Sequence, residues 1–178
     1  MTIDPELRSR TTQEKILRSI VDRLRDKIER LNDQNCFLSD QAIPVILPGG
    51  RYAVTVSPGA GSFVGQMFAG AGSATITEDG SVIITPIVIV NLDRPRQYSQ
   101  RLTGDDDNTW GIYQWKTAIL KALFGFDDGW EPRDGDQPLL RDQLSPLNSD
   151  APADVIIGKA NAVAMKLVVS TAFDWDVS

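Results

Sequence analysis

Five of the fourteen residues at positions 59–72 are glycine, and the run before them, 52–57, has the β-branched character of a strand. A strand followed by closely spaced glycines can bring backbone N–H groups up to a phosphate, as the loops of nucleotide-binding enzymes do. The sequence therefore raises the question of whether this segment binds a nucleotide or uses glycine only for its shape.

The spacing of the glycines argues against a dinucleotide site. The fingerprint G-x-G-x-x-G lies between a strand and a helix, but Gly59, Gly61 and Gly65 are one residue too widely spaced, and Val64 takes the place of the third glycine. Glu78 lies at the distance expected of a ribose-binding acid. The segment after it, however, reads as another strand, whereas a βαβ unit needs a crossover helix there.

The phosphate-loop motif fails as well, because Gly158-Lys159 has neither the following Ser or Thr nor the upstream glycine. We predict instead that residues 57–73 form a glycine-rich arm. Its glycines would serve a flexible hairpin, β-bulges or close packing of backbones. A small nucleotide-binding enzyme stays as the less favoured alternative.

Composition limits other catalytic chemistry. The chain has no histidine, which excludes Ser-His-Asp and Cys-His catalysis and the usual zinc sites. Its single cysteine, Cys36, cannot form an internal disulfide, and we expect a buried thiol rather than a nucleophile. The aspartates at 105–107 and 127–136 do not follow the calcium-loop spacing. We therefore predict a protein that is not an enzyme, with no catalytic residue, no cofactor and no metal site.

The net charge of −6 is unevenly distributed. Residues 105–154 hold eleven acids and four bases, whereas residues 8–30 hold eight bases and four acids. The acidic total argues against bulk binding of nucleic acid, and we expect no sequence-specific nucleic-acid partner. The opposite local charges either form two solvated faces or guide subunits toward one another. The longest strongly apolar run, 82–90, is too short to span a bilayer, so we expect a soluble protein without a membrane partner.

A loop at residues 94–101 combines arginine with an aromatic side chain. Arg94, Arg96 and Arg101 surround Tyr98, a composition that suits contact with a partner chain or with nucleic acid. A solvated loop is the alternative interpretation. The acidic total of the chain makes a protein the better functional partner.

Two helices are predicted from hydrophobic periodicity. Residues 12–32 place an apolar stripe on one face and arginine and lysine on the other, and Thr11 begins a capping box. Residues 109–124 form the second helix, which Asn108 is placed to cap and Gly125 to end. The apolar positions expected to be buried are Ile16, Leu17, Ile20, Val21, Leu24, Ile28 and Leu31, then Ile112, Trp115, Ile119, Ala122 and Leu123.

Strands account for most of the remaining chain. Residues 42–48 and 51–57 read as short strands, and Asp79-Gly80 is a favoured two-residue turn of a long β-hairpin. The second arm of that hairpin, 82–92, is apolar on both alternating faces. We expect it to lie centrally, with a helix over one face and a second cover, which could be another subunit, over the other.

The C-terminal part combines a long loop with a long strand. Residues 125–153 contain four prolines and no sustained period, and Trp130, Leu139 and Leu140 indicate that part of this loop docks on something. Residues 163–176 alternate apolar and polar side chains, which predicts a long, bent, half-buried strand. The order of elements predicts a single α+β domain over the whole chain, with a mixed or antiparallel sheet packed by the two helices.

This layout resembles that of the tail terminator proteins of tailed bacteriophages, also called tail-completion or minor tail proteins of the head-tail junction. The segments that carry the resemblance are QEKILRSIVDRLRDKI, SVIITPIVIVNLDR, WKTAILKALFG and the terminal AVAMKLVVSTAFDWD. The chain departs from the smaller members of that family in its glycine-rich arm and in the loop 125–153. Those departures leave open a related role as a neck, connector or minor tail protein.

The resemblance implies a non-catalytic α+β subunit that assembles into a hexameric ring. Such a ring caps the finished tail tube and joins it to neck or connector proteins, and its lumen would leave room for DNA to pass. We therefore expect a virion protein of the head-tail junction, assembled in the host cytoplasm. The residues expected at subunit or partner interfaces are Phe63, Met67, Phe68, Arg94, Arg96, Tyr98, Arg101, Trp130, Leu139 and Leu140.

Overall fold

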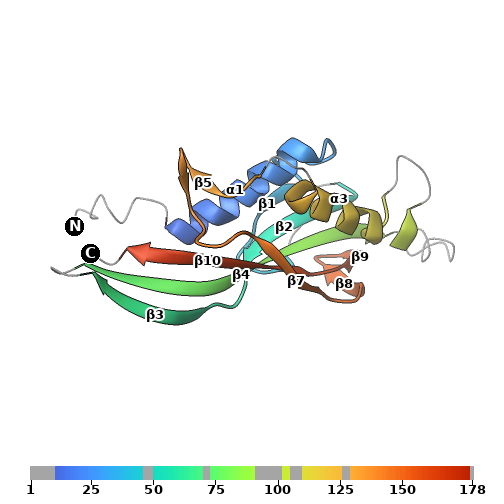
Figure 1. The fold of residues 1–178 in the computed structure, drawn as a ribbon. Helices are drawn as coiled ribbons and strands as arrows, with labels where there is room; N and C mark the ends of the chain where they lie inside the picture. Colours follow the sequence, from blue (N-terminus) through green and yellow to red (C-terminus); the bar gives the residue numbers. More distant parts are fainter. Residues whose placement is uncertain are drawn as a thin grey trace, which may run out of the picture.

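The computed structural model describes residues 11–45, 50–69, 73–90, 102–104, 110–125 and 129–176. Two helices, α1 (Thr12–Lys27) and α3 (Ile112–Phe124), pack on one face of a mixed eight-stranded sheet (Figure 1). The fold is therefore α+β, as the order of elements predicts. The strands are β1 (Cys36–Leu38), β2 (Tyr52–Pro58), β3 (Ser62–Ala69), β4 (Ser73–Val90), β7 (Ser145–Ser149), β8 (Ala153–Ile157), β9 (Ala160–Ala164) and β10 (Leu167–Asp176), with β5 (Arg133–Asp134) and β6 (Gln137–Pro138) forming a separate pair.

Strand β4 is the centre of the sheet. It is 18 residues long and pairs antiparallel with other strands along both of its edges. On one edge β3 pairs with the first half of β4 and β2 with the second half, so that Ser62 lies opposite Asp79 and Pro58 opposite Val82. On the other edge, β10 pairs with the first half and the middle of β4, and β9 pairs with its last residues. Farther out, β7 and β8 line β10 and β9, and β1 pairs parallel with β2.

The hairpin turn expected at Asp79-Gly80 is wrong. Both residues lie within β4 and pair with β10. The turn preference of an Asp-Gly pair is local, and pairing along both edges of the strand outweighs it here. A hairpin does exist, but it joins β3 to β4, where Ala69 lies opposite Ser73. The connecting residues 70–72 lie outside the described residues.

The long C-terminal strand is confirmed, with one break between β9 and β10. Both strands follow the same edge of β4 without a change of register, since Ala164 lies opposite Ile87 and Leu167 opposite Ile84. The break faces Pro86, whose carbonyl points toward this edge and accepts an N–H at 3.3 Å. Because proline has no N–H to give in return, the pairing is interrupted at this point.

Helix α1 begins where predicted and ends earlier. The side chain of Thr11 accepts the N–H of Glu14 at 3.3 Å. The helix stops at Lys27 rather than at residue 32, because Ile28 adopts an extended conformation with φ −117° and ψ 97°. The apolar stripe nevertheless stays buried as far as Leu31.

Helix α3 begins later than predicted. It starts at Ile112 and not at residue 109, with Gly111 as its N-cap. The N–H of Gly111 donates to Oε1 of Gln114 at 2.8 Å, so a side chain of the first turn supports the cap. Asn108, the predicted cap, lies outside the described residues. Gly125 is the C-cap, as predicted.

The strand predicted at 42–48 is wrong for residues 42–45, which are irregular, and residues 46–48 lie outside the described residues. The carbonyl of Ala42 accepts a hydrogen bond from the Thr55 hydroxyl of β2 at 2.8 Å, and Ile43 packs on the sheet face away from the helices. Residues 42–45 therefore cross a face of the sheet. Proline at position 44 is compatible with this path, because the segment needs no ladder of hydrogen bonds.

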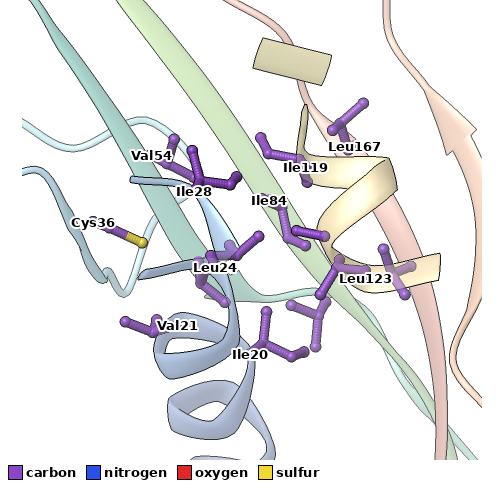
Figure 2. Packing of buried hydrophobic residues seen from close by; sticks show 14 of the residues in the cluster. Ile20, Val21, Leu24, Ile28, Cys36, Val54, Ile84, Ile119, Leu123 and Leu167 are labelled. Carbon is purple, nitrogen blue, oxygen red and sulfur yellow. The ribbon is translucent and has the colours of Figure 1, made fainter. Parts of the chain in front are cut away.

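The main core lies between the helices and the sheet. Figure 2 shows Leu24 of α1 and Ile119 of α3 close to Ile84 of β4. All positions predicted to be buried on the two helices are at most 8% exposed. A second, smaller cluster lies on the opposite face around Ile87, whose neighbours Ile157, Ala162 and Ala164 come from β8 and β9. Ile87 is 0% exposed and Ile43 packs against this cluster, so at Ile87 the second cover of β4 is the chain itself and not another subunit.

Removing a buried side chain from the centre of the sheet should cost much of the stability of the fold. Ile84 is 0% exposed, so Ile84→Ala should lower the free energy of unfolding by about 2–5 kcal/mol. Urea denaturation followed by circular dichroism measures this loss. Ile156→Ala is the matched control, because Ile156 is 75% exposed and should lose less than about 0.5 kcal/mol. Equal losses in the two variants would contradict the central place of β4.

Candidate functional site

The sheet extends past the helices at one end of the molecule. In Figure 1, β3 and the paired ends of β4 and β10 reach beyond the start of α1. We refer to β3, residues 73–80 of β4 and residues 171–176 of β10 as the arm. This arm contains β3, which forms part of the glycine-rich segment, and three of the residues predicted to contact a partner.

Two glycines at the start of the arm allow close approach of backbone and side chains. The N–H of Gly59 donates to the carbonyl of Ser81 at 2.8 Å, and the hydroxyl of Ser81 donates to the carbonyl of Ala60 at 2.8 Å. A Cβ atom on Gly59 would overlap this hydroxyl, and a Cβ atom on Gly61 would overlap the carboxyl of Glu78. Close packing, one of the three roles expected for the glycines, is therefore what these two residues provide.

Polar contacts on both faces of the arm tie β4 to β10. On the face that carries the helices, Nε1 of Trp175 donates to Oε2 of Glu78 at 2.7 Å. On the other face, the hydroxyl of Thr77 donates to Oδ1 of Asp174 at 2.7 Å, and Nη1 of Arg141 donates to the same hydroxyl at 3.3 Å. The described part of the arm is thus a braced sheet rather than a loose hairpin.

Strand β3 is an open edge of this sheet. Among the described residues it pairs with β4 alone, and its sequence SFVGQMFA contains neither a charged residue nor a proline. Phe63 and Val64 are 72% and 61% exposed. Proteins usually protect edge strands with charges, prolines or bulges, and β3 has only a bulge, between Phe63 and Gly65. An exposed apolar edge of this kind is suited to pairing with another chain.

The predicted interface residues fall into three groups. Phe63 is exposed on β3, and the backbones of Met67 and Phe68 continue that strand opposite β4. Trp130, Leu139 and Leu140 are discussed below. The remaining four, which lie outside the described residues, are Arg94, Arg96, Tyr98 and Arg101. The structure thus places three of the predicted residues together on β3, whereas the three of the segment after α3 lie at the main core.

The loop predicted at 125–153 is wrong in part, because it contains the strands β5, β6 and β7, and the segment docks on its own chain. Leu140 is 7% exposed and belongs to the main core, and Trp130 and Leu139 pack against that core. The guanidinium of Arg23 lies 5.2 Å from the ring centre of Trp130. The docking partner that these apolar residues indicate is therefore the chain itself. Their contribution to an interface between subunits stays a prediction.

Arg23 is a structural residue that the sequence pattern does not reveal. It lies on α1, where arginine is expected on the solvated face, yet it is only 8% exposed. Its Nε donates to the carbonyl of Ala122 in α3 at 2.9 Å, and its guanidinium also faces Trp130. The one signal in the sequence is spacing, because Arg23 follows Ile20 by three positions and so borders the buried stripe.

A shallow depression of about 420 Å³ lies between α1 and the segment after α3. Several of its charges are already paired within the chain, Lys15 with Asp134 at 2.6 Å and Arg133 with Glu131 at 2.7 Å. The lining mixes both signs of charge with one aromatic ring: Lys15, Arg18, Ser19, Asp22, Arg23, Asp26, Trp130, Arg133 and Asp134. Such a surface offers no converging set of groups for one ligand.

The part of the chain that the structure describes contains neither a metal-binding cluster nor a membrane-spanning helix. In that part of the chain, no three His, Cys, Asp or Glu side chains are grouped so that they could hold a metal ion. None of the helices described is both long enough and apolar enough to cross a membrane.

Cys36 is a buried thiol, as predicted. It is 0% exposed and lies in the main core. Burial raises the pKa of the Cys36 thiol to about 12, although the neighbouring Arg25 opposes the rise. The thiolate is the reactive form of cysteine, so a thiol with this pKa is inert near neutral pH.

Replacement of Gly59 should destabilise the start of the arm. Gly59→Val places side-chain atoms against the Ser81 hydroxyl and should lower the free energy of unfolding by about 1–3 kcal/mol, as overpacking does. The neighbouring Ala60 is exposed, so Ala60→Val is a matched control that should change stability little. Urea denaturation of both variants tests this, and a stable Gly59→Val protein would show that the glycine is not needed for close packing.

The Cys36 thiol should make stability depend on pH in the alkaline range. Its pKa is about 12 in the folded chain against an ordinary value of 9.0, so the unfolded chain releases the proton first as the pH rises. The free energy of unfolding therefore falls between those two values, by about 2 kcal/mol at about pH 10.5. Urea denaturation at about pH 8 and about pH 10.5 should show that Cys36→Ala lacks this part of the decline. An identical decline in both proteins would rule out the buried neutral thiol.

No protein-family model matches this chain, and no curated protein is similar enough in sequence to count as a relative. The features available for a functional argument are therefore those of the chain itself, and the open edge of β3 is the foremost among them.

Proposed function

We propose that this chain is a structural subunit of a tailed-bacteriophage virion, a tail terminator that forms a ring on the end of the tail tube and joins it to the neck. The observation that carries the proposal is the uncharged open edge of β3, which displays Phe63 and Val64 on a braced arm. A strand of this kind would be a hazard in a protein that stays monomeric. It is an asset in a subunit that must bind its neighbours.

The layout of the resemblance supports the same function. Its four segments correspond to α1, the second half of β4, α3, and β9 with β10. The two strand segments pair with each other, since β9 and β10 follow one edge of β4, and both helices pack over this sheet. The segments that carry the likeness therefore form one continuous core, and the arm and the loop after α3 are attached to it.

The mechanism under this proposal is binding without turnover. Burying one exposed apolar side chain such as Phe63 contributes about 1.5–3 kcal/mol, which is modest for a single contact. A closed ring repeats the contact at every subunit, so a weak interface becomes a stable assembly. The partners are then further copies of this chain, the tail tube and the neck proteins, with no membrane and no sequence-specific nucleic acid. The site of action is the head-tail junction of the virion.

A charge placed on the open edge should prevent ring formation. Phe63→Asp puts a carboxylate at a side chain that is 72% exposed, so the subunit should fold normally but fail to bury that position against a neighbour. Light scattering and negative-stain electron microscopy should show six-fold rings for the wild type and single subunits for the variant. Circular dichroism checks that the variant is folded.

Tyr113→Asp is the control for this experiment, because Tyr113 is 45% exposed on α3 and lies away from β3. Its rings should be unaffected. A wild-type protein that stays strictly monomeric, even at high concentration and with tail tubes present, would overturn the proposed function. Rings that form equally well with Phe63→Asp would remove β3 from the interface.

A further inference from the structure

The sheet has a second open edge, on the side of β4 away from β3. There β8 is an outermost strand, and among the described residues it pairs with β9 alone. Ile156 of β8 is 75% exposed. Because β3 pairs with the first half of β4 and β9 with its last residues, the two open edges lie at opposite sides and opposite ends of the sheet (Figure 1).

The exposed side chains of the two edges lie on the same face of the sheet. Phe63 is directly opposite Glu78, which bonds Trp175 on the helix-bearing face. In β8, Val155 and Ile157 pack on the cluster at the other face, so Ile156 between them points to the helix-bearing face. In a sheet that continued from one chain to the next with the helices on one side, these two apolar side chains would meet.

Charge distinguishes this arrangement from pairing of two β3 strands. The sequence of the arm carries the acids Glu78, Asp79, Asp174 and Asp176 and no lysine or arginine. Two arms placed edge to edge would bring two surfaces of like charge toward each other, which does not favour association. Residues 153–166, by contrast, hold Lys159 and Lys166 against a single acid. An acidic arm is therefore complementary to the β8 edge and not to a second arm.

Strand β7, the other outer strand on this side, is less suited than β8 to pair with a strand of another chain. It contains Pro146, which cannot donate to a neighbouring strand, and its five residues are all exposed. β8 has no proline, and two of its side chains are held in the second cluster. The edge of β8 is therefore the better one for pairing with another chain.

We propose that β3 of one copy adds to the open edge of β8 in the next copy, so that a single sheet runs from chain to chain with Phe63 against Ile156. The inference rests on the proposed self-assembly and names its surfaces. The contact is heterologous, since each copy offers β3 on one side and β8 on the other. A heterologous contact repeats from copy to copy and forms a ring where the rotation closes.

Cross-linking between engineered cysteines tests this contact. Phe63→Cys and Ile156→Cys are each introduced into the Cys36→Ala background and mixed. Paired strands bring directly opposite residues within disulfide range, and a short bis-maleimide captures the pair if the register is shifted. Linked dimers should form in the mixture but not in either protein alone. Tyr113→Cys mixed with Ile156→Cys is the control and should not link.

A charge reversal provides a second readout that needs no cysteine. Lys159→Glu should weaken assembly at low salt, because it faces the acidic arm, and Asp79→Lys combined with it should restore assembly. Sedimentation of the two variants and the wild type measures the effect. Loss without rescue would show that these two charges do not face each other, and would overturn the pairing of β3 with β8.

The outcomes separate this inference from the proposed function. Links in Phe63→Cys alone would show that two β3 strands pair, and rings without a mixed link would show that another surface closes the ring. Either result overturns the β3–β8 contact but does not contradict the proposed ring. A protein that does not self-associate at all overturns the proposed function as well.

Discussion

The pairing of β4 along both of its edges is the constraint on which the rest of this structure depends. A strand of 18 residues that is bonded on both sides determines the direction and register of β2, β3, β9 and β10. The helices then cover only one part of the resulting sheet. The remainder projects as the arm, which has to be held by contacts of its own, such as those of Trp175 with Glu78 and of Thr77 with Asp174.

This division between a covered body and a projecting arm lets one sheet serve both stability and the proposed assembly. In the body, β4 is buried between the helices and a second cluster around Ile87. In the arm, the same strand supports β3, whose outer edge has no partner among the described residues. Substitutions in the body should therefore act on folding, whereas substitutions at Phe63 should act on association. The two effects can be separated because they reside in different parts of one strand.

Much of the fold could be predicted because periodicity is a local property. The buried faces of both helices follow from side chains three or four positions apart. The hairpin could not be located, because the turn preference of Asp79-Gly80 is local, whereas the β10 strand that pairs with it lies far away in the chain. The burial of Arg23 could not be predicted for the same reason, because its partner carbonyl at Ala122 is supplied by another helix. The uncharged composition of β3 is visible in the sequence, but its position at the edge of the sheet is a property of the topology.

The order of strands along the chain has a consequence for how the protein is made. β2, β3 and β4 are neighbours in sequence and can pair as soon as they emerge, whereas β9 and β10 follow only after α3 and the loop that docks on the core. Until then β4, whose second half is apolar on both faces, presents an unpaired edge to the surrounding solution. Two unfinished chains could pair through that edge, or exchange their terminal strands, before either is complete. Under the proposed virion function, the synthesis of many copies in one infected cell would make this interval the time of greatest risk, and rapid closure of β10 on β4 the step that ends it.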